Sequence, residues 1–225
     1  MGLFYEDDLV TLFHGDCREE LAWLNADVLV TDPPYGVAFS EKRTKRQKVG
    51  AIIGDDSTDT RDMAVGLWRE QQGGVNKPAL LFGHYRIPRP VDTRHVLIWS
   101  KGDNTGLGDT SLPWGVSYEE IYVMGRGFKG SREPNIITCP TIPSSHWLRQ
   151  RHPAPKPVPL IERLLSKCPP EWVVADPFAG SGATVIAARN LGRRVVAVEL
   201  EERYCELIVE RIQNTPVGLF DEFEE

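Results

Sequence analysis

A segment toward the C-terminal end of the chain constrains the fold more than any other. Its apolar run, residues 172–175, is followed by a stretch with two glycines, residues 178–182, and then by a helix-forming run, residues 185–191. A second β-branched run, residues 193–200, carries Glu199 near its end. This order predicts a strand, a tight turn, a helix and a second strand, so we expect an α/β sheet. The glycines let a ligand approach the backbone, and an acid at this distance is typical of nucleotide binding through ribose hydroxyls.

The tetrapeptide Asp32-Pro33-Pro34-Tyr35 ends another mostly apolar run, residues 27–31. Neither proline has an amide hydrogen and both have a fixed φ angle, so the turn cannot continue a strand ladder and its carbonyls point outward. A carboxylate, a main-chain carbonyl and an aromatic ring at one strand end form a cage for a planar amine. A turn that only ends a strand is the alternative interpretation, as an ordinary βα turn is for the glycine stretch.

Taken together, the two motifs resemble those of a known family. Residues 178–182 resemble the Phe-x-Gly-x-Gly loop that binds S-adenosylmethionine in amino-group DNA methyltransferases, and residues 32–35 resemble their catalytic tetrapeptide. The tetrapeptide precedes the loop, as in the β class of these enzymes; protein glutamine methyltransferases have the opposite order. The resemblance spans Leu12 to about Ile212 and implies a circularly permuted class I methyltransferase fold, which is Rossmann-like.

The resemblance also implies a role for each residue of the tetrapeptide. Asp32 and the carbonyl of Pro33 would accept the two hydrogens of the target amine, with Pro34 completing the turn. Tyr35 would stack on the base after it has been flipped out of double-stranded DNA. A core tyrosine is the alternative for Tyr35.

For the cofactor, the resemblance implies a site built from several segments. The adenine ring would lie at residues 16–17, the methionine end at Asp176 and the glycine loop, and the ribose at Glu199. A basic side chain in residues 152–157 would bind the cofactor's carboxylate, and Thr184 would both cap the following helix and touch the cofactor. The cofactor-binding residues expected from this comparison are Asp16, Cys17, Asp32, His152, Lys156, Asp176, Phe178, Gly180, Ser181, Gly182, Thr184 and Glu199.

The remaining pattern predicts one domain, residues 1–225, built on a doubly wound and mostly parallel sheet with an antiparallel strand. Expected strands cover residues 9–13, 28–31, 79–83, 96–100 and 119–124, the last antiparallel to its predecessor, and expected helices cover residues 18–24, 61–71 and 157–168. Residues 40–60 and 129–155 read as irregular segments that the sheet cannot use, and loops of this length tend to be functional or disordered.

The net charge of −6 hides a local cluster of basic residues just after the tetrapeptide. The acids instead gather in a C-terminal tail, residues 216–225. Because phosphate affinity depends on the local patch, we expect DNA contacts from loops at 40–60 and 127–151, although a solvated basic loop is the alternative. The candidate DNA-binding residues are Lys42, Arg43, Lys45, Arg46, Lys48, Arg126, Lys129 and Arg132. These loops are small, which predicts a short or relaxed recognition sequence and two subunits sharing one duplex.

Composition is that of a soluble globular protein and predicts a cytoplasmic location, because the chain has neither a membrane-spanning apolar run nor a signal segment. The four cysteines and five histidines are dispersed, so we expect reduced thiols and no metal site.

An aspartate at the first motif position favours adenine N6 over cytosine N4, because the family's cytosine members more often have serine there. Cytosine N4 is nevertheless the closest alternative chemically. Methylation of RNA or protein, and a binding protein with a decayed site, are more distant alternatives.

Overall fold

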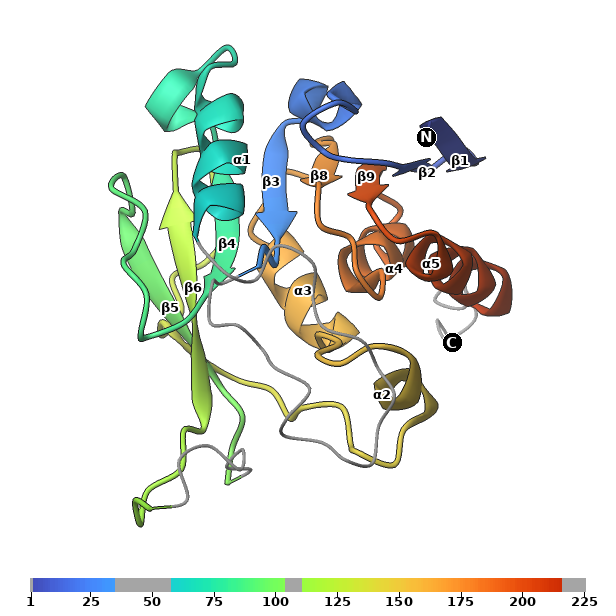
Figure 1. Ribbon diagram of the computed structural model, residues 1–225. Coiled ribbons are helices and arrows are strands. Elements are labelled where there is room, and N and C mark those ends of the chain that lie inside the picture. Colours follow the sequence, from blue (N-terminus) through green and yellow to red (C-terminus); the bar gives the residue numbers. More distant parts are fainter. Residues whose placement is uncertain (1, 35–57, 104–110, 216–225) are drawn as a thin grey trace, which may run out of the picture.

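The computed structural model describes residues 2–34, 58–103 and 111–215. Within these ranges the chain forms a nine-stranded sheet in the order β1-β2-β9-β8-β3-β4-β6-β5-β7 (Figure 1). The strands are β1 (Gly2–Glu6), β2 (Val10–His14), β3 (Val28–Thr31), β4 (Ala79–Gly83), β5 (His95–Ser100), β6 (Tyr118–Met124), β7 (Ile136–Thr138), β8 (Val174–Asp176) and β9 (Val195–Glu199).

Neighbouring strands are parallel except in three pairs. β1 is antiparallel to β2, and β6 is antiparallel to both β4 and β5. β8 and β9 come last in the chain, yet they lie in the sheet between β2 and β3. The predicted mixed, mostly parallel sheet is therefore confirmed.

Helices cover both faces of this sheet, which is the doubly wound arrangement (Figure 1). On one face α3 (Val158–Leu165), α4 (Ala183–Asn190) and α5 (Glu202–Asn214) share one buried cluster with Val28 and Val30 of β3. On the other face α1 (Asp59–Arg69) and the 3-10 helix η1 (Ala22–Asn25) share a second buried cluster with Leu29. Successive side chains of β3 thus reach opposite layers, as expected for a strand buried on both sides. The short elements α2 (Trp147–Arg151) and η3 (Gly74–Asn76) complete the described fold.

The helix predicted over residues 18–24 is wrong. The Asp16 side chain accepts the backbone N–H of Arg18 at 2.9 Å, and the backbone carbonyl of Asp16 accepts the N–H groups of Glu19 and Glu20. These local bonds form a turn that competes with a helix, as aspartate does elsewhere. Only η1 follows, and it buries Trp23 between the sheet and α1.

The prediction that the sheet cannot use residues 129–155 is also wrong. β7 pairs in parallel with β5 at its edge, and α2 follows it. Three residues with a single buried side chain, Ile137, are too short a pattern to indicate a strand from sequence. β1 and α5 were not predicted either. Residues 35–57, which include most of the first irregular segment, lie outside the described ranges. None of the described helices is long and apolar enough to cross a membrane.

Candidate active site

Sheet pairing brings the two sequence motifs together. β3 and β8 are parallel neighbours, with Val28 opposite Val174 and Leu29 opposite Ala175. Asp32 follows β3, and Asp176 is the last residue of β8. The Thr31 hydroxyl donates a hydrogen bond of 2.6 Å to Asp176 Oδ1 and so links the two strand ends directly.

A cavity of about 810 Å³ opens beyond these carboxyl ends, which is where α/β sheets bind ligands. Its size is typical of a small-molecule site. Every predicted cofactor residue except Gly182 lines it, and so do Pro33 and Pro34. Tyr35 lies outside the described residues.

Gly182 serves the backbone instead of the cavity wall. It is the N-cap of α4 with φ +78°, in the left-handed region. A Cβ there would lie 2.7 Å from Ile208 Cγ1 on α5, so glycine allows the two helices to approach. Thr184 is likewise not the helix cap that we predicted. It lies within α4, and its hydroxyl faces the Val30 carbonyl at 3.5 Å.

Glu199 holds the glycine loop in place. Its Oε2 accepts the Gly180 N–H at 2.7 Å, and its Oε1 accepts the Glu201 N–H at 2.8 Å. Burial nevertheless raises the pKa of Glu199 to about 7. Burial likewise raises the pKa of Asp176 to about 6, despite the hydrogen bond from Thr31. Hydrogen-bond donors from a ligand would favour the ionised form of either carboxyl group.

His152 lies directly beside this loop on the cavity wall. Its Nδ1 accepts the backbone N–H of Ala154 at 3.2 Å, so the proton of the neutral ring is assigned to Nε2. A Cβ on Gly180 would lie 3.0 Å from that Nε2. Burial, and then the charge of Lys156, lower the pKa of His152 to about 3. His152 is therefore a neutral hydrogen-bond donor beside the loop.

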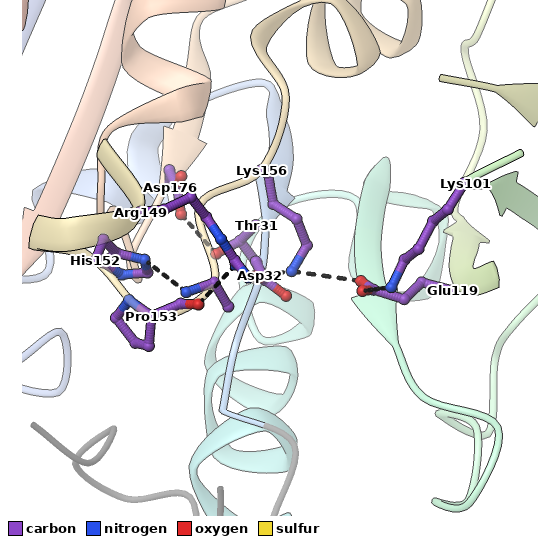
Figure 2. Close-up of polar contacts among 10 residues, drawn as sticks. Thr31, Asp32, Lys101, Glu119, Arg149, His152, Pro153, Lys156 and Asp176 are labelled. Carbon is purple, nitrogen blue, oxygen red and sulfur yellow. Dashed lines mark hydrogen bonds and ion pairs between the residues drawn. The ribbon is translucent and has the colours of Figure 1, made fainter. Parts of the chain in front are cut away.

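Lys156 is buried, and the partners of its ammonium were not predicted. We expected a cofactor carboxylate there, but the structure places the ammonium on the Asp32 carboxylate and 3.4 Å from Glu119 Oε2 (Figure 2). Lys101 Nζ in turn lies 2.7 Å from Glu119 Oε1. The sequence signal for Glu119 was a pair of acids, Glu119 and Glu120, at the start of an otherwise apolar strand.

The predicted adenine-contacting residues also lie on the cavity wall. Asp16 is paired with Arg18, whose hydrogen bonds hold the pKa of Asp16 below its usual value. Burial raises the pKa of the Cys17 thiol to about 12, so it is an uncharged wall group. The Cys17 carbonyl accepts the indole N–H of Trp23 at 3.0 Å, which fixes the backbone after β2.

The far end of the cavity was not predicted from sequence. It is formed by the ends of β4, β5 and β6 and the residues that follow β4, and its wall includes Phe82, His84, Arg86, Lys101, Tyr118 and Glu119. The Tyr85 and Tyr118 rings lie 6.1 Å apart there. Among the residues that the structure describes, no group of three or more His, Cys, Asp or Glu could hold a metal ion.

The candidate DNA-binding residues divide into two groups. Those between 42 and 48 lie outside the described residues. Arg126 bonds Asn76, just before β4, and the backbone of Lys129 bonds that of Lys167, just after α3. Both therefore lie at the end of the sheet opposite the cavity. Arg132 lies there too, because its two neighbours, Ser131 and Glu133, accept hydrogen bonds from the Lys167 ammonium. This position is remote from the cavity and does not support our expectation that these three residues contact DNA.

Comparisons with known proteins agree with this geometry. Residues 99–210 match the model of a DNA methylase family, N6_N4_Mtase. The chain is 41% identical to the Type II methyltransferase M.ScaI of Streptomyces caespitosus over 96% of its own length and 86% of that protein. Among solved structures, it resembles the M1.HpyAVI–SAM complex with a TM-score of 0.64 and 20% identity, covering 90% of this chain and all of that one. It also resembles the cytosine-N4-specific PvuII DNA methyltransferase with a TM-score of 0.70 and 13% identity, covering 100% of this chain and 91% of that one.

The fold and the cavity at its strand ends define a class I S-adenosylmethionine-dependent methyltransferase. The chain belongs to the DNA methylase family, whose members methylate amino groups in DNA. Its cofactor is S-adenosylmethionine.

Proposed function

We propose that this DNA methyltransferase transfers a methyl group to the exocyclic N6 of adenine in double-stranded DNA. The observation that supports it best is the Asp32 carboxylate, which faces the same cavity as the glycine loop and is paired with the Lys156 ammonium. An ammonium beside a carboxylate favours the ionised form of the acid. Asp32 then acts as a hydrogen-bond acceptor for an amine.

The target amine needs such an acceptor because its lone pair is delocalised into the base ring. Asp32 and the Pro33 carbonyl accept its two hydrogens and hold the nitrogen where it can become tetrahedral. S-adenosylmethionine, when bound, supplies an electrophilic methyl group on a sulfonium. Alignment of nitrogen, methyl and sulfur in one line then accounts for much of the acceleration. The amine is inaccessible in a duplex, so the base must be flipped out to reach Asp32.

The described residues fit that cofactor. Gly180 has φ +50° and a side-chain atom there would meet His152, so the loop has room for a ligand only as glycine. Glu199 would accept the ribose hydroxyls, with Asp16 and Cys17 at the adenine ring. Phe178, Ser181 and Asp176 would bind the methionine end. The neutral Nε2–H of His152 would donate to its carboxylate, a role we assign to His152 because the Lys156 ammonium is engaged by two protein carboxylates.

The choice of base is the first testable prediction. Asp32 stands where the family's cytosine members more often have serine, so we expect N6-methyladenine. DNA methylated by the protein would be digested to nucleosides and the product identified by mass spectrometry. N4-methylcytosine as the sole modified nucleoside would replace adenine by cytosine in this proposal and leave the roles of Asp32 and Pro33 unchanged, because both amines present two hydrogens.

DNA binding gives a second prediction. Neutralising Lys42, Arg43, Lys45, Arg46 and Lys48 together is expected to weaken binding to every duplex. It should also flatten the dependence of log affinity on log salt, by up to about 0.9 for each phosphate that the protein no longer neutralises. The measurement is affinity against salt concentration on matched and unrelated duplexes.

The matched control neutralises Arg126, Lys129 and Arg132, which lie at the end of the sheet away from the cavity. This variant should keep the wild-type salt slope. Parallel slopes for wild type and the five-residue variant would instead show that residues 42–48 do not contact phosphates.

We also propose that two subunits share one duplex, which the stoichiometry of the same complexes would test.

A further inference from the structure

Four charged side chains of alternating sign cross the cavity wall from β3 to β5. They are Asp32 after β3, Lys156 before α3, Glu119 on β6 and Lys101 after β5 (Figure 2). The Lys156 ammonium is bonded to Asp32 and lies 3.4 Å from Glu119 Oε2. Glu119 Oε1 lies 2.7 Å from Lys101 Nζ. Neither Glu119 nor Lys101 has a role in the function proposed above.

Burial makes this chain of charges interdependent. Lys156 is 7% exposed, and its ammonium lies 5.3 Å from the centre of the Phe82 ring. A buried ammonium is costly unless it is paired. Burial lowers the pKa of Lys156, but Asp32 and then Glu119 outweigh it and the net shift is upward. Burial similarly raises the pKa of Glu119, but Lys156 and Lys101 outweigh it and the net shift is downward.

The sheet fixes where Glu119 points. Side chains of β6 alternate between faces, so Glu119 shares the α3 face with Ile121, whereas Glu120 shares the α1 face with Tyr122. β6 is hydrogen-bonded to β4, and β4 to β3, which carries Asp32 at its end. The backbone position of Glu119 is therefore fixed relative to that of Asp32. The side chain of Lys156, in contrast, has several rotatable bonds.

We propose that Glu119 is a positioning residue for methyl transfer: anchored by Lys101, it holds the Lys156 ammonium against Asp32. The inference rests on the proposed role of Asp32. With a carboxylate on either side, the ammonium is confined between β3 and β6, and Asp32 keeps one orientation and its negative charge. Without the Glu119 carboxylate, the long Lys156 side chain changes rotamer. The Asp32 carboxylate then loses its single orientation.

The direct test is Glu119→Gln, which keeps the shape and removes the charge. We expect kcat to fall about 10- to 100-fold, as when outer partners that orient a reactive group are removed. The affinity for S-adenosylhomocysteine, measured by calorimetry, should stay nearly unchanged, since Glu119 is separated from the glycine loop by Lys156 and Asp32.

Glu120→Gln is the matched control. Glu120 is the next residue of the same strand, is buried, and pairs with Arg89 at 2.7 Å on the other face. This variant also removes a buried carboxylate from β6, so it should lower the melting temperature while kcat stays at the wild-type value. Equal losses of kcat in the two variants would mean that Glu119 acts only through stability, and the proposal would fail.

A second readout follows Lys156 itself. The NMR signal of its 13C-labelled ε-carbon would be titrated, and Glu119→Gln should lower the pKa of Lys156 because one of two carboxylates is gone. The alkaline limb of the kcat profile should move to lower pH with it. The other titratable groups that face this pair are Asp32, Lys101, His84 and His152. The two histidines have lowered pKa values and titrate below that limb. An unchanged Lys156 titration would overturn the proposal.

Lys101→Met provides a test that does not depend on the folding of the Glu119 variant. It removes one of the two cations that lower the pKa of Glu119, so Glu119 should become protonated at higher pH. The pKa of Glu119 should therefore rise, and the NMR signal of its 13C-labelled side-chain carboxyl would be titrated to measure it. A Glu119 titration that is unchanged in Lys101→Met would contradict the anchoring role of Lys101.

The two readouts separate this inference from the proposed function. If the wild-type protein transfers no methyl group to DNA, the proposed function fails. The Lys156 titration then still decides whether Glu119 holds the ammonium. If wild type is active and Glu119→Gln is equally active, the function stands and the positioning role is rejected.

Discussion

Asp32→Ala is expected to abolish methyl transfer while leaving cofactor affinity nearly intact. The variant removes the acceptor that holds the amine in the reactive orientation, and loss of one such preorganised polar group typically costs about 100- to 1,000-fold in kcat. Binding of S-adenosylhomocysteine should survive because the glycine loop is held by Glu199 through its own hydrogen bonds. Single-turnover transfer and calorimetric titration would measure the two effects separately.

Asp32→Asn is the control for the structural part of this change. It preserves shape but leaves the Lys156 ammonium with Glu119 as its remaining described carboxylate partner. We expect kcat to fall by a similar factor, because an amide in place of the carboxylate would face the amine with its NH2 or a weaker acceptor. Loss of cofactor binding equal to the loss of transfer in both variants would reject the separate role assigned to Asp32.

Gly180→Asp is expected to have the opposite pattern, with cofactor binding as the primary loss. Gly180 has φ +50°, and a Cβ there would lie 3.0 Å from His152 Nε2. The new side chain would add bulk and negative charge beside Glu199, whose carboxylate accepts the Gly180 N–H. We expect the affinity for S-adenosylhomocysteine to fall at least about 100-fold, which corresponds to about 2.7 kcal/mol.

Gly192→Ala separates backbone strain from occupation of the site. Gly192 also has a left-handed φ, +63°, but a Cβ there meets nothing within 4 Å. Its substitution should cost about 1–2 kcal/mol of stability through the backbone alone and leave cofactor affinity unchanged. If Gly180→Asp and Gly192→Ala weakened the cofactor equally, the glycine loop would not be the cofactor site.

Sequence patterns predicted much of this fold because long buried strands carry a strong signal. The run at 79–83 was predicted with the bounds of β4, and the antiparallel pairing of β6 was also predicted. Short elements and turns were harder to predict from the sequence. The turn at Asp16 replaced the predicted helix because its side chain competes for backbone N–H groups. β7 was missed because three residues at a sheet edge give no periodicity.

The residues of the candidate site were likewise predicted only in part. Asp32 and Gly180 were predicted because each belongs to a short motif in which the residue types and their spacing have a chemical or steric reason. The partners of Lys156 were not, since Glu119 comes from a strand whose distance from Asp32 depends on sheet order rather than on sequence spacing. Arg126 was assigned to DNA from its charge and its place beside the predicted loop at 127–151, and strand direction places it at the end of the sheet away from the cavity.

The most direct test of the proposed function is transfer of a tritiated methyl group from S-adenosylmethionine, with duplex DNA, RNA and protein offered in parallel. Wild-type protein and Asp32→Asn would be compared at equal saturation with cofactor. We predict label in duplex DNA alone, recovered as N6-methyladenine, and a rate of transfer at least about 100-fold lower with Asp32→Asn. Label in RNA or protein but not in DNA, or transfer that is independent of Asp32, would contradict it.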